Sequence, residues 1–222
     1  MPRRAREHRQ IQRVNSSSLR KGVLAAAGAV EASRDELCRL DAGAGDGDHG
    51  VTMALAARAV RQAIDSAPDA AAPELLTKIA LAMGSVGGAI GPIYASGLLA
   101  IAGTVRKLEP DGPLTVAGLR ACAEAAEAAI TQLGHAKPGD KTIVDALSPA
   151  VDALRQADVS GTTFDVALAA AAAAARQGAE STAAMVASVG RASRLGERSR
   201  GVADPGASSF ALIMGALAAA AG

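Results

Sequence analysis

A run of alanines, Ala167-Leu-Ala-Ala-Ala-Ala-Ala-Ala-Ala175, is interrupted only by Leu168 and indicates the fold class of this chain. Alanine is the residue that most favours an α-helix, whereas strands are enriched in β-branched and aromatic side chains. Aromatic residues are scarce over the full 222 residues, with two phenylalanines, one tyrosine and no tryptophan. We therefore predict an all-α protein.

Helical periodicity and helix-breaking residues divide the chain into eight helical segments, without a convincing strand. No linker or change of composition separates these segments, so we predict one domain over residues 17–222, after a basic, frayed tail over residues 1–16. Short connections favour an antiparallel up-and-down bundle or barrel. Asp140 and Asp204 are predicted to cap the sixth and eighth helices. The predicted helices are Ser17–Leu40, His49–Ser66, Pro73–Val86, Pro92–Leu108, Thr115–Leu133, Lys141–Gln156, Thr163–Ser188 and Pro205–Ala220.

Charge and apolar patterning argue against several kinds of partner. A formal net charge of +1 provides no basic surface for nucleic acid. The longest apolar runs, Ala167–Ala175 and Phe210–Ala221, are too short to span a bilayer. The basic stretch Arg3–Arg13 lacks the apolar segment of a signal peptide, and the two cysteines suit a reducing compartment. We expect a cytoplasmic protein that binds neither nucleic acid nor membranes.

The connections between the predicted helices alternate between two kinds. Those after the second, fourth and sixth helices are plain turns, whereas those after the first, third, fifth and seventh carry unusual sequences. Alternate connections of an up-and-down bundle lie at the same end, so we expect the four unusual loops to meet there. These loops are Asp41–Gly50, Gly84–Pro92, Gly134–Thr142 and Gly190–Ala207.

The first loop, Asp41-Ala-Gly-Ala-Gly-Asp46-Gly-Asp48-His49-Gly50, threads three carboxylates through glycines. Carboxylates brought together without a basic neighbour repel one another unless a cation lies between them. Mg²⁺ prefers hard oxygen ligands, and these three could bridge two ions about 3.5–4 Å apart. The alternative is a solvated turn that caps the next helix. His49 could contact phosphates or only cap that helix.

Four helix N-termini are expected at the end where the unusual loops meet. Free N–H groups and the helix dipole make such termini anion sites, and Lys141 and Arg191 would add positive charge. This combination predicts polyphosphate binding. Lys141 could instead pair with Asp145 one helical turn later, and Gly87–Gly91 could be a simple tight turn. The sequence contains no Gly-Lys-Ser/Thr, so this is not a P-loop.

Four motifs in this order resemble the L subunit of dihydroxyacetone kinase, which is equivalent to the nucleotide-binding C-terminal domain of the ATP-dependent enzymes. The resemblance extends over nearly the whole chain from about Ser17 onward. The motifs are Asp41-x4-Asp46-Gly-Asp48-His49-Gly50, Gly87-Gly88-Ala89-x-Gly91-Pro92, Pro138-Gly139-Asp140-Lys141-Thr142-x-x-Asp145, and Gly190-Arg191-Ala192-Ser193-x-Leu195-Gly196-Glu197-Arg198-Ser199 with Asp204-Pro205-Gly206-Ala207.

The resemblance implies an eight-helix antiparallel barrel that holds ADP or ATP and two Mg²⁺ in a pocket at one end. Asp41, Asp46 and Asp48 would be the metal ligands and, with Arg191, the residues of the phosphoryl-transfer step. The nucleotide would be surrounded by His49, Gly50, Val51, Thr52, Ala89, Ile90, Gly134, Ile143, Arg191, Asp204, Pro205 and Gly206.

The implied function is that of a kinase subunit, which passes phosphate from Mg-bound nucleotide to dihydroxyacetone held on a separate K-type subunit. The chain has no room for that sugar-binding domain, so it should be inactive alone. The phosphoryl donor could be free ATP or a protein of the phosphotransferase system that rephosphorylates ADP in place. Alternatives are another keto-sugar such as erythrulose, an ADP-sensing module that binds a transcription regulator, or a degenerate structural paralogue.

Several positions depart from the family pattern. Thr52 stands where the family usually has asparagine, Ile90 replaces a common serine, and Arg194 replaces a usual tyrosine. Val202-Ala203 lacks the histidine often found before the Asp-Pro-Gly turn. The long, polar connection Arg191–Gly206 is predicted to be a lid that nucleotide binding orders.

Overall fold

The computed structural model describes residues 16–43, 45–108 and 114–222, so the predicted tail lies outside the described residues except for Ser16. These residues form nine α-helices and two 3₁₀ helices and no strand, which confirms the all-α prediction. The elements are α1 (Ser16–Ala32), α2 (Arg34–Ala42), α3 (His49–Asp65), α4 (Ala72–Gly84), α5 (Ile90–Val105), α6 (Val116–Gly134), α7 (Val144–Ser160), α8 (Phe164–Ser181), η1 (Thr182–Ala184), η2 (Arg191–Ser199) and α9 (Pro205–Ala221).

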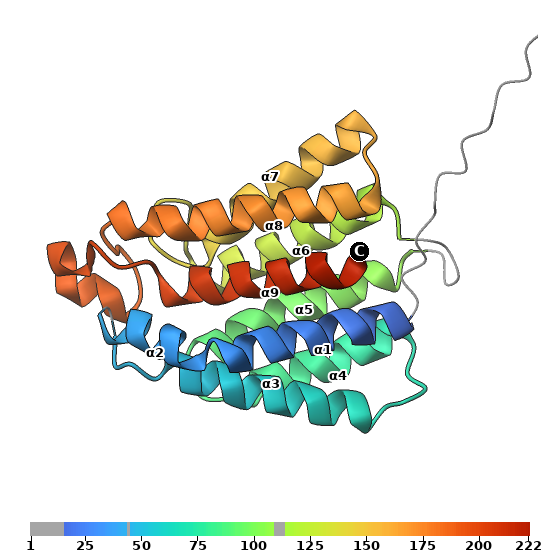
Figure 1. The fold of residues 1–222 in the computed structure, drawn as a ribbon, viewed down its shortest axis with the longest axis horizontal. Coiled ribbons are helices and arrows are strands. Elements are labelled where there is room, and N and C mark those ends of the chain that lie inside the picture. The colour runs from blue at the N-terminus through green and yellow to red at the C-terminus, as the bar shows by residue number, and fades with distance from the viewer. Residues whose placement is uncertain (1–15, 44, 109–113) are drawn as a thin grey trace, which may run out of the picture.

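The long helices close into a ring. Each of α3 to α8 contacts the next α-helix along the chain, α1 contacts α3, and α9 returns to contact α1. The helices run side by side along the long axis of the molecule, and α2 and η2 lie together at one end (Figure 1). The predicted antiparallel barrel is therefore confirmed. Among the described residues, no helix combines the length and the apolar character that crossing a membrane requires.

Small side chains allow the helices of the ring to approach closely. In α8, Ala167, Ala171 and Ala175 are fully buried against α7, where Ala150 and Leu154 pack on them. Their spacing of four residues keeps them on one face of the helix, which is the face turned to the core. The alanine run thus supplies both helix propensity and a flat packing surface.

The prediction of one helix from Ser17 to Leu40 is wrong, because the chain breaks at Ser33 between α1 and α2. The break allows α2 to bury Leu37 completely and to carry Asp41 into the protein. It also presents α2 to the start of α3, where a Cβ at Gly50 would overlap the carbonyl oxygen of Arg34. Glycine at position 50 is therefore required by the packing of α2 on α3.

Two predicted boundaries near the unusual loops are also wrong. The sixth predicted helix starts at Val144 rather than Lys141, because Lys141 adopts a positive φ of 60°. Asp140 accordingly does not cap that helix, and its carboxylate accepts hydrogen bonds from Lys137 N (2.8 Å) and Ser188 Oγ (2.6 Å). The seventh predicted helix ends at Ser181 instead of continuing to Ser188. By contrast, Asp204 caps α9 as predicted and accepts from Ala207 N at 2.7 Å.

Helices α7 and α8 approach each other closely at Gly178. Pro149 has no N–H to donate to the carbonyl of Asp145 four residues earlier, and α8 lies against that carbonyl. A Cβ at Gly178 would overlap the Asp145 oxygen and lie 3.0 Å from Ala146 Cα. Both obstacles are backbone, which cannot move aside cheaply.

We expect Gly178→Ala to destabilise the protein by about 2 kcal/mol or more, as overpacking against backbone does. Gly215→Ala is the matched control, because Gly215 lies within α9 and, among the described residues, no atom outside the local helix backbone lies within 4 Å of the added methyl group. That change should stabilise the protein by about 0.5–1 kcal/mol through helix propensity. Urea unfolding followed by circular dichroism measures both, and equal effects of the same sign would contradict the prediction.

Candidate metal and nucleotide site

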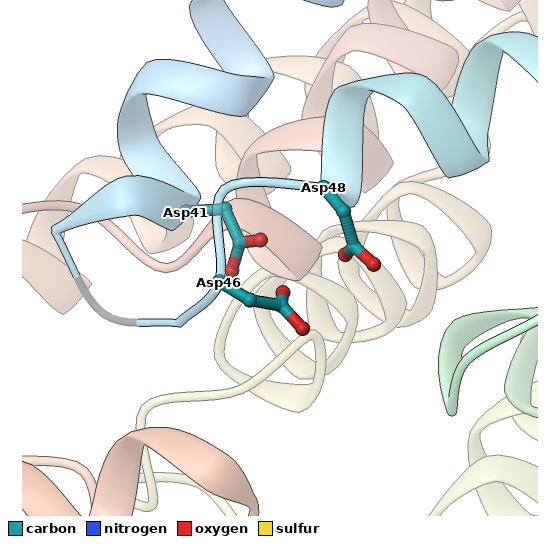
Figure 2. A group of neighbouring side chains, drawn as sticks. All are labelled: Asp41, Asp46 and Asp48. Carbon is teal, nitrogen blue, oxygen red and sulfur yellow. The ribbon is translucent and has the colours of Figure 1, made fainter.

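Three aspartates converge where α2 gives way to α3. Asp41 is buried near the end of α2, Asp46 lies in the glycine turn, and Asp48 precedes the first residue of α3. One carboxylate oxygen from each lies within 4.8 Å of the other two. Figure 2 shows Asp41, Asp46 and Asp48 arranged around the turn that leads into α3. The predicted acidic cluster is therefore present, with one buried member and two exposed ones.

The geometry of this turn depends on glycine at position 45. A Cβ there would overlap Oδ1 of Asp41. The other Asp41 carboxylate oxygen accepts a hydrogen bond from His49 N at 3.1 Å. Asp41 is thus fixed between the turn and α3, whereas Asp46 and Asp48 keep about half of their side-chain surface exposed.

The carboxylates perturb one another. Partial burial and the neighbouring Asp46 raise the pKa of Asp48. Burial also acts to raise the pKa of Asp46, but the hydrogen bond from Asp48 and the charge of Arg191 outweigh it and lower that pKa. Two carboxylates with opposed shifts are typical of a pair that shares one proton.

Arg191 reaches this cluster from the connection between α8 and α9. Its guanidinium forms an ion pair with Asp46, and its Nη2 lies 3.8 Å from Asp48 Oδ1. The sequence predicted that Arg191 would lie at this end of the molecule, and it does. Its neighbours in the structure are the aspartates, so the same side chain has two possible anionic partners, carboxylate and phosphate.

His49 turns its imidazole into the protein. Ser209 Oγ donates to the carbonyl of Gly206 (3.0 Å) and lies 3.1 Å from His49 Nε2 and 3.3 Å from Tyr94 Oη. With its proton directed to Gly206, Ser209 can accept from both His49 and Tyr94. Burial lowers the pKa of His49, although the Asp41 carboxylate opposes this shift. One hydroxyl therefore joins the N-terminal parts of α3, α5 and α9.

The Asp204–Gly206 turn forms the start of α9. Besides capping the helix, Asp204 donates its N–H to Thr182 Oγ1 at 2.8 Å. The pKa of Asp204 is raised to about 6, chiefly by burial; the N–H of Ala207 acts to lower this pKa and the charge of Asp145 acts to raise it. Gly206 faces Ile143, with 3.8 Å between the Ile143 Cβ and the position of an added Cβ. Two of the predicted nucleotide loops thus touch.

The remaining predicted residues lie at the start or end of helices. Val51 is exposed and Thr52 half-buried in the first turn of α3. Ala89 precedes α5 and is exposed, whereas Ile90 is half-buried against the core. Gly134 ends α6 and lies against the side chain of Ile93, which places it beside the first turn of α5.

Lys141 does not lie where the sequence predicted. Its side chain is buried, and its ammonium donates to backbone carbonyls of the α8–α9 connection rather than to Asp145 or an external anion. Asp145 instead accepts from the backbone N–H groups of Gly139 and Thr142. The proposed i, i+4 pair between Lys141 and Asp145 is therefore wrong.

The α8–α9 connection, residues 182–204, is folded on itself. Gly201 N donates to Ala183 O (2.8 Å), Arg200 donates to Ala184 O (2.7 Å), and Ala187 N donates to the buried Ser199 Oγ (3.0 Å). These contacts fix both ends of the connection. Ordering of a lid by nucleotide stays a prediction, now limited to the exposed part around η2.

Sequence reasoning missed Ser209, Tyr94 and Thr182, which support the site from within the core. Two signals could have found the first two. Tyr94 is the only tyrosine of the chain and follows Ile90 by one helical turn, and Ser209 is a polar residue directly before the apolar run of the last helix.

Comparison with known proteins gives a consistent set of similarities. A family model described as the DAK2 domain matches residues 43–219. The ADP-binding subunit DhaL of the PEP-dependent dihydroxyacetone kinase 2 of Listeria innocua is 36% identical over 83% of this chain and 85% of that subunit. The L-erythrulose 1-kinase of Mycolicibacterium smegmatis is 43% identical over 82% of this chain, but over only 32% of that enzyme.

A solved structure shares the fold. The native dihydroxyacetone kinase of C. freundii superposes with a TM-score of 0.70 at 26% sequence identity, over 99% of this chain and 37% of that one. The chain therefore spans about a third of the length of this kinase and of the erythrulose kinases that it matches.

Proposed function

The chain belongs to the DAK2 domain family, and from this premise we propose that it is the nucleotide-binding, phosphoryl-transfer part of a dihydroxyacetone-kinase-type enzyme. The observation that carries the proposal is the cluster of Asp41, Asp46 and Asp48. Arg191, which lies 145 residues after Asp46 in the sequence, contacts this cluster from another loop. Such a cluster combines ligands for a hard cation with a group for phosphate.

The chemistry of the three aspartates fits magnesium. Asp41 is held in place by the N–H of His49, whereas Asp46 and Asp48 are open to solvent and to a ligand. All three offer the oxygen ligands that Mg²⁺ prefers, and few enough to leave room for water and phosphate oxygens. We propose that they hold two Mg²⁺ ions, which would offset the charge of the nucleotide phosphates when bound.

The nucleotide, ADP or ATP, is proposed to lie against the first turns of the helices that start at this end. His49–Thr52 and Ala89–Ile90 would line it, with backbone N–H groups from Gly50, Val51, Ala89 and Ile90, because the N–H groups of His49 and Thr52 already bond to Asp41 and Asp48. Gly134, Ile143 and the Asp204–Gly206 turn would enclose the rest. Arg191 would offset charge on the transferred phosphoryl group, so catalysis would depend on positioning and electrostatics rather than on a chemical base in this chain.

The phosphoryl acceptor is proposed to be dihydroxyacetone presented by a K-type subunit or domain. The DhaL relative of this chain is the ADP-binding subunit of a PEP-dependent dihydroxyacetone kinase, which supports rephosphorylation of bound ADP by a phosphotransferase-system protein. Free ATP is the alternative donor. A second candidate acceptor is erythrulose, because an erythrulose kinase matches this chain at 43% identity.

We expect the purified chain with Mg·ATP to transfer no phosphate to dihydroxyacetone or erythrulose. The described helices all belong to one barrel, so this part of the chain holds no second domain for a sugar. Addition of a K-type subunit loaded with the matching sugar should start turnover, followed by ³¹P NMR of the sugar phosphate. Native mass spectrometry of the chain alone should show bound ADP with Mg²⁺. Turnover without a partner, or no nucleotide binding at all, would refute this assignment.

A further inference from the structure

Lys141 is a buried cation whose donors are all used inside the protein. Only 2% of its surface is exposed. Its Nζ donates to the carbonyl oxygens of Thr182 (2.8 Å), Met185 (3.3 Å) and Val202 (2.6 Å). A lysine ammonium has three N–H groups, so these three bonds saturate it. Lys141 therefore has no donor left for a phosphate.

The three acceptors lie at the two ends of the α8–α9 connection. Thr182 and Met185 follow the end of α8, whereas Val202 lies two residues before Asp204. The same end of α8 also binds the second half of the connection through Thr182 Oγ1 and the N–H of Asp204. The ammonium thus closes the base of the loop that carries Arg191.

The loop that supplies Lys141 is attached to the same connection at a further point. Ser188 donates its backbone N–H to Asp140 O (3.3 Å) and its hydroxyl to the Asp140 carboxylate (2.6 Å). Lys141 itself adopts a left-handed backbone conformation, which is unfavourable for a residue other than glycine. Surrounding contacts must maintain such a conformation. The three carbonyl bonds are contacts of that kind.

We propose that Lys141 is a positioning residue that fixes the α8–α9 connection, and with it Arg191 and the Asp204–Gly206 turn, against the loop that carries Ile143. This inference rests on the proposed nucleotide site and assigns to Lys141 no contact with the nucleotide. Residues that orient groups of a binding site from behind commonly change affinity or activity by about 10–100-fold when they are replaced.

The test compares Lys141→Met with Lys137→Met. Lys137 belongs to the same loop, but its side chain is exposed and it hydrogen-bonds to Asp140 through its backbone N–H and carbonyl groups. For Lys141→Met we expect Mg·ADP affinity to fall at least ~10-fold. We also expect amide hydrogen exchange across residues 182–206 to rise in the free protein, with no weakening of Mg²⁺ binding to the aspartate loop. Lys137→Met should leave all three measurements within about twofold of the wild type, because surface substitutions have small effects.

Each other outcome has a defined meaning. Loss of Mg·ADP affinity with unchanged hydrogen exchange in the free protein would show that Lys141 contacts the ligand directly, and it would overturn the proposal. Raised hydrogen exchange with wild-type Mg·ADP affinity would also overturn it. If Lys141→Met does not fold, Lys141→Gln, which keeps two donors, should change affinity and exchange together, and wild-type values for both would overturn it. A wild-type protein that binds no Mg·ADP refutes the proposed function, whereas wild-type binding with an unaffected Lys141→Met refutes only the role of Lys141.

Discussion

Replacement of Asp46 by alanine should abolish Mg²⁺-dependent ADP binding and leave the helical barrel intact. Asp46 lies in a turn, keeps about half of its side-chain surface exposed, and bonds to Arg191 rather than to the core. Its loss removes one of three ligands and part of the negative charge that attracts the metal. We expect Mg·ADP affinity by calorimetry to fall at least ~100-fold, at the upper end of effects seen around metal sites. The far-ultraviolet circular dichroism spectrum should be unchanged.

The choice of Asp46 separates binding from folding. Asp41 is unsuitable, because it is buried and accepts the N–H of His49, so its replacement would also disturb the start of α3. Asp69→Ala is the matched control, since Asp69 is an exposed aspartate in the turn between α3 and α4. That variant makes the same change of charge and should bind Mg·ADP like the wild type. Unchanged affinity in Asp46→Ala would rule out this loop as the metal site.

The fold could be predicted from the sequence wherever local signals determine it. Alanine content determines the helical class, and the predicted starts at Thr115 and Pro205 lie within one residue of the starts of α6 and α9. The errors arise where distant contacts decide the boundary. The break at Ser33 depends on packing of α2 against α3, and the end of α8 depends on an ammonium from residue 141 that binds the carbonyls beyond it.

The candidate site could be predicted in part, for the same physical reason. Asp41, Asp46 and Asp48 lie within eight residues, so a glycine turn is enough to bring them together. The direction of a side chain at a helix start depends instead on the neighbouring elements. His49 turns inward because its imidazole forms a hydrogen bond with the Ser209 hydroxyl, and Ser209 is 160 residues away in the chain. Nothing in the local sequence distinguishes that orientation from one toward a phosphate.

Replacement of Arg191 by methionine should have opposite effects on the metal and on the nucleotide. In the structure the guanidinium pairs with Asp46 and Asp48, the two exposed members of the cluster, so it competes with a cation for them. An exposed ion pair contributes little, and its removal should tighten the binding of Mg²⁺ alone by up to about fivefold. Mg·ADP should bind about tenfold more weakly or worse, because a charge-assisted contact with the phosphates is lost.

Opposite changes in the affinities for Mg²⁺ and for Mg·ADP identify the two roles of Arg191. If Arg191 only stabilised the loop, its replacement would weaken the binding of both ligands. If Arg191 were only solvated, its replacement would change neither affinity. Arg194→Met is the control, since Arg194 is exposed in the same 3₁₀ helix and forms no ion pair within the described part of the chain. Titration calorimetry with Mg²⁺ alone and with ADP at saturating Mg²⁺ measures both affinities. Weaker Mg²⁺ binding in Arg191→Met, with wild-type Mg²⁺ affinity in Arg194→Met, would mean that Arg191 supports the aspartate loop instead of competing with the metal. That result would refute the proposal that Arg191 exchanges a carboxylate partner for a phosphate.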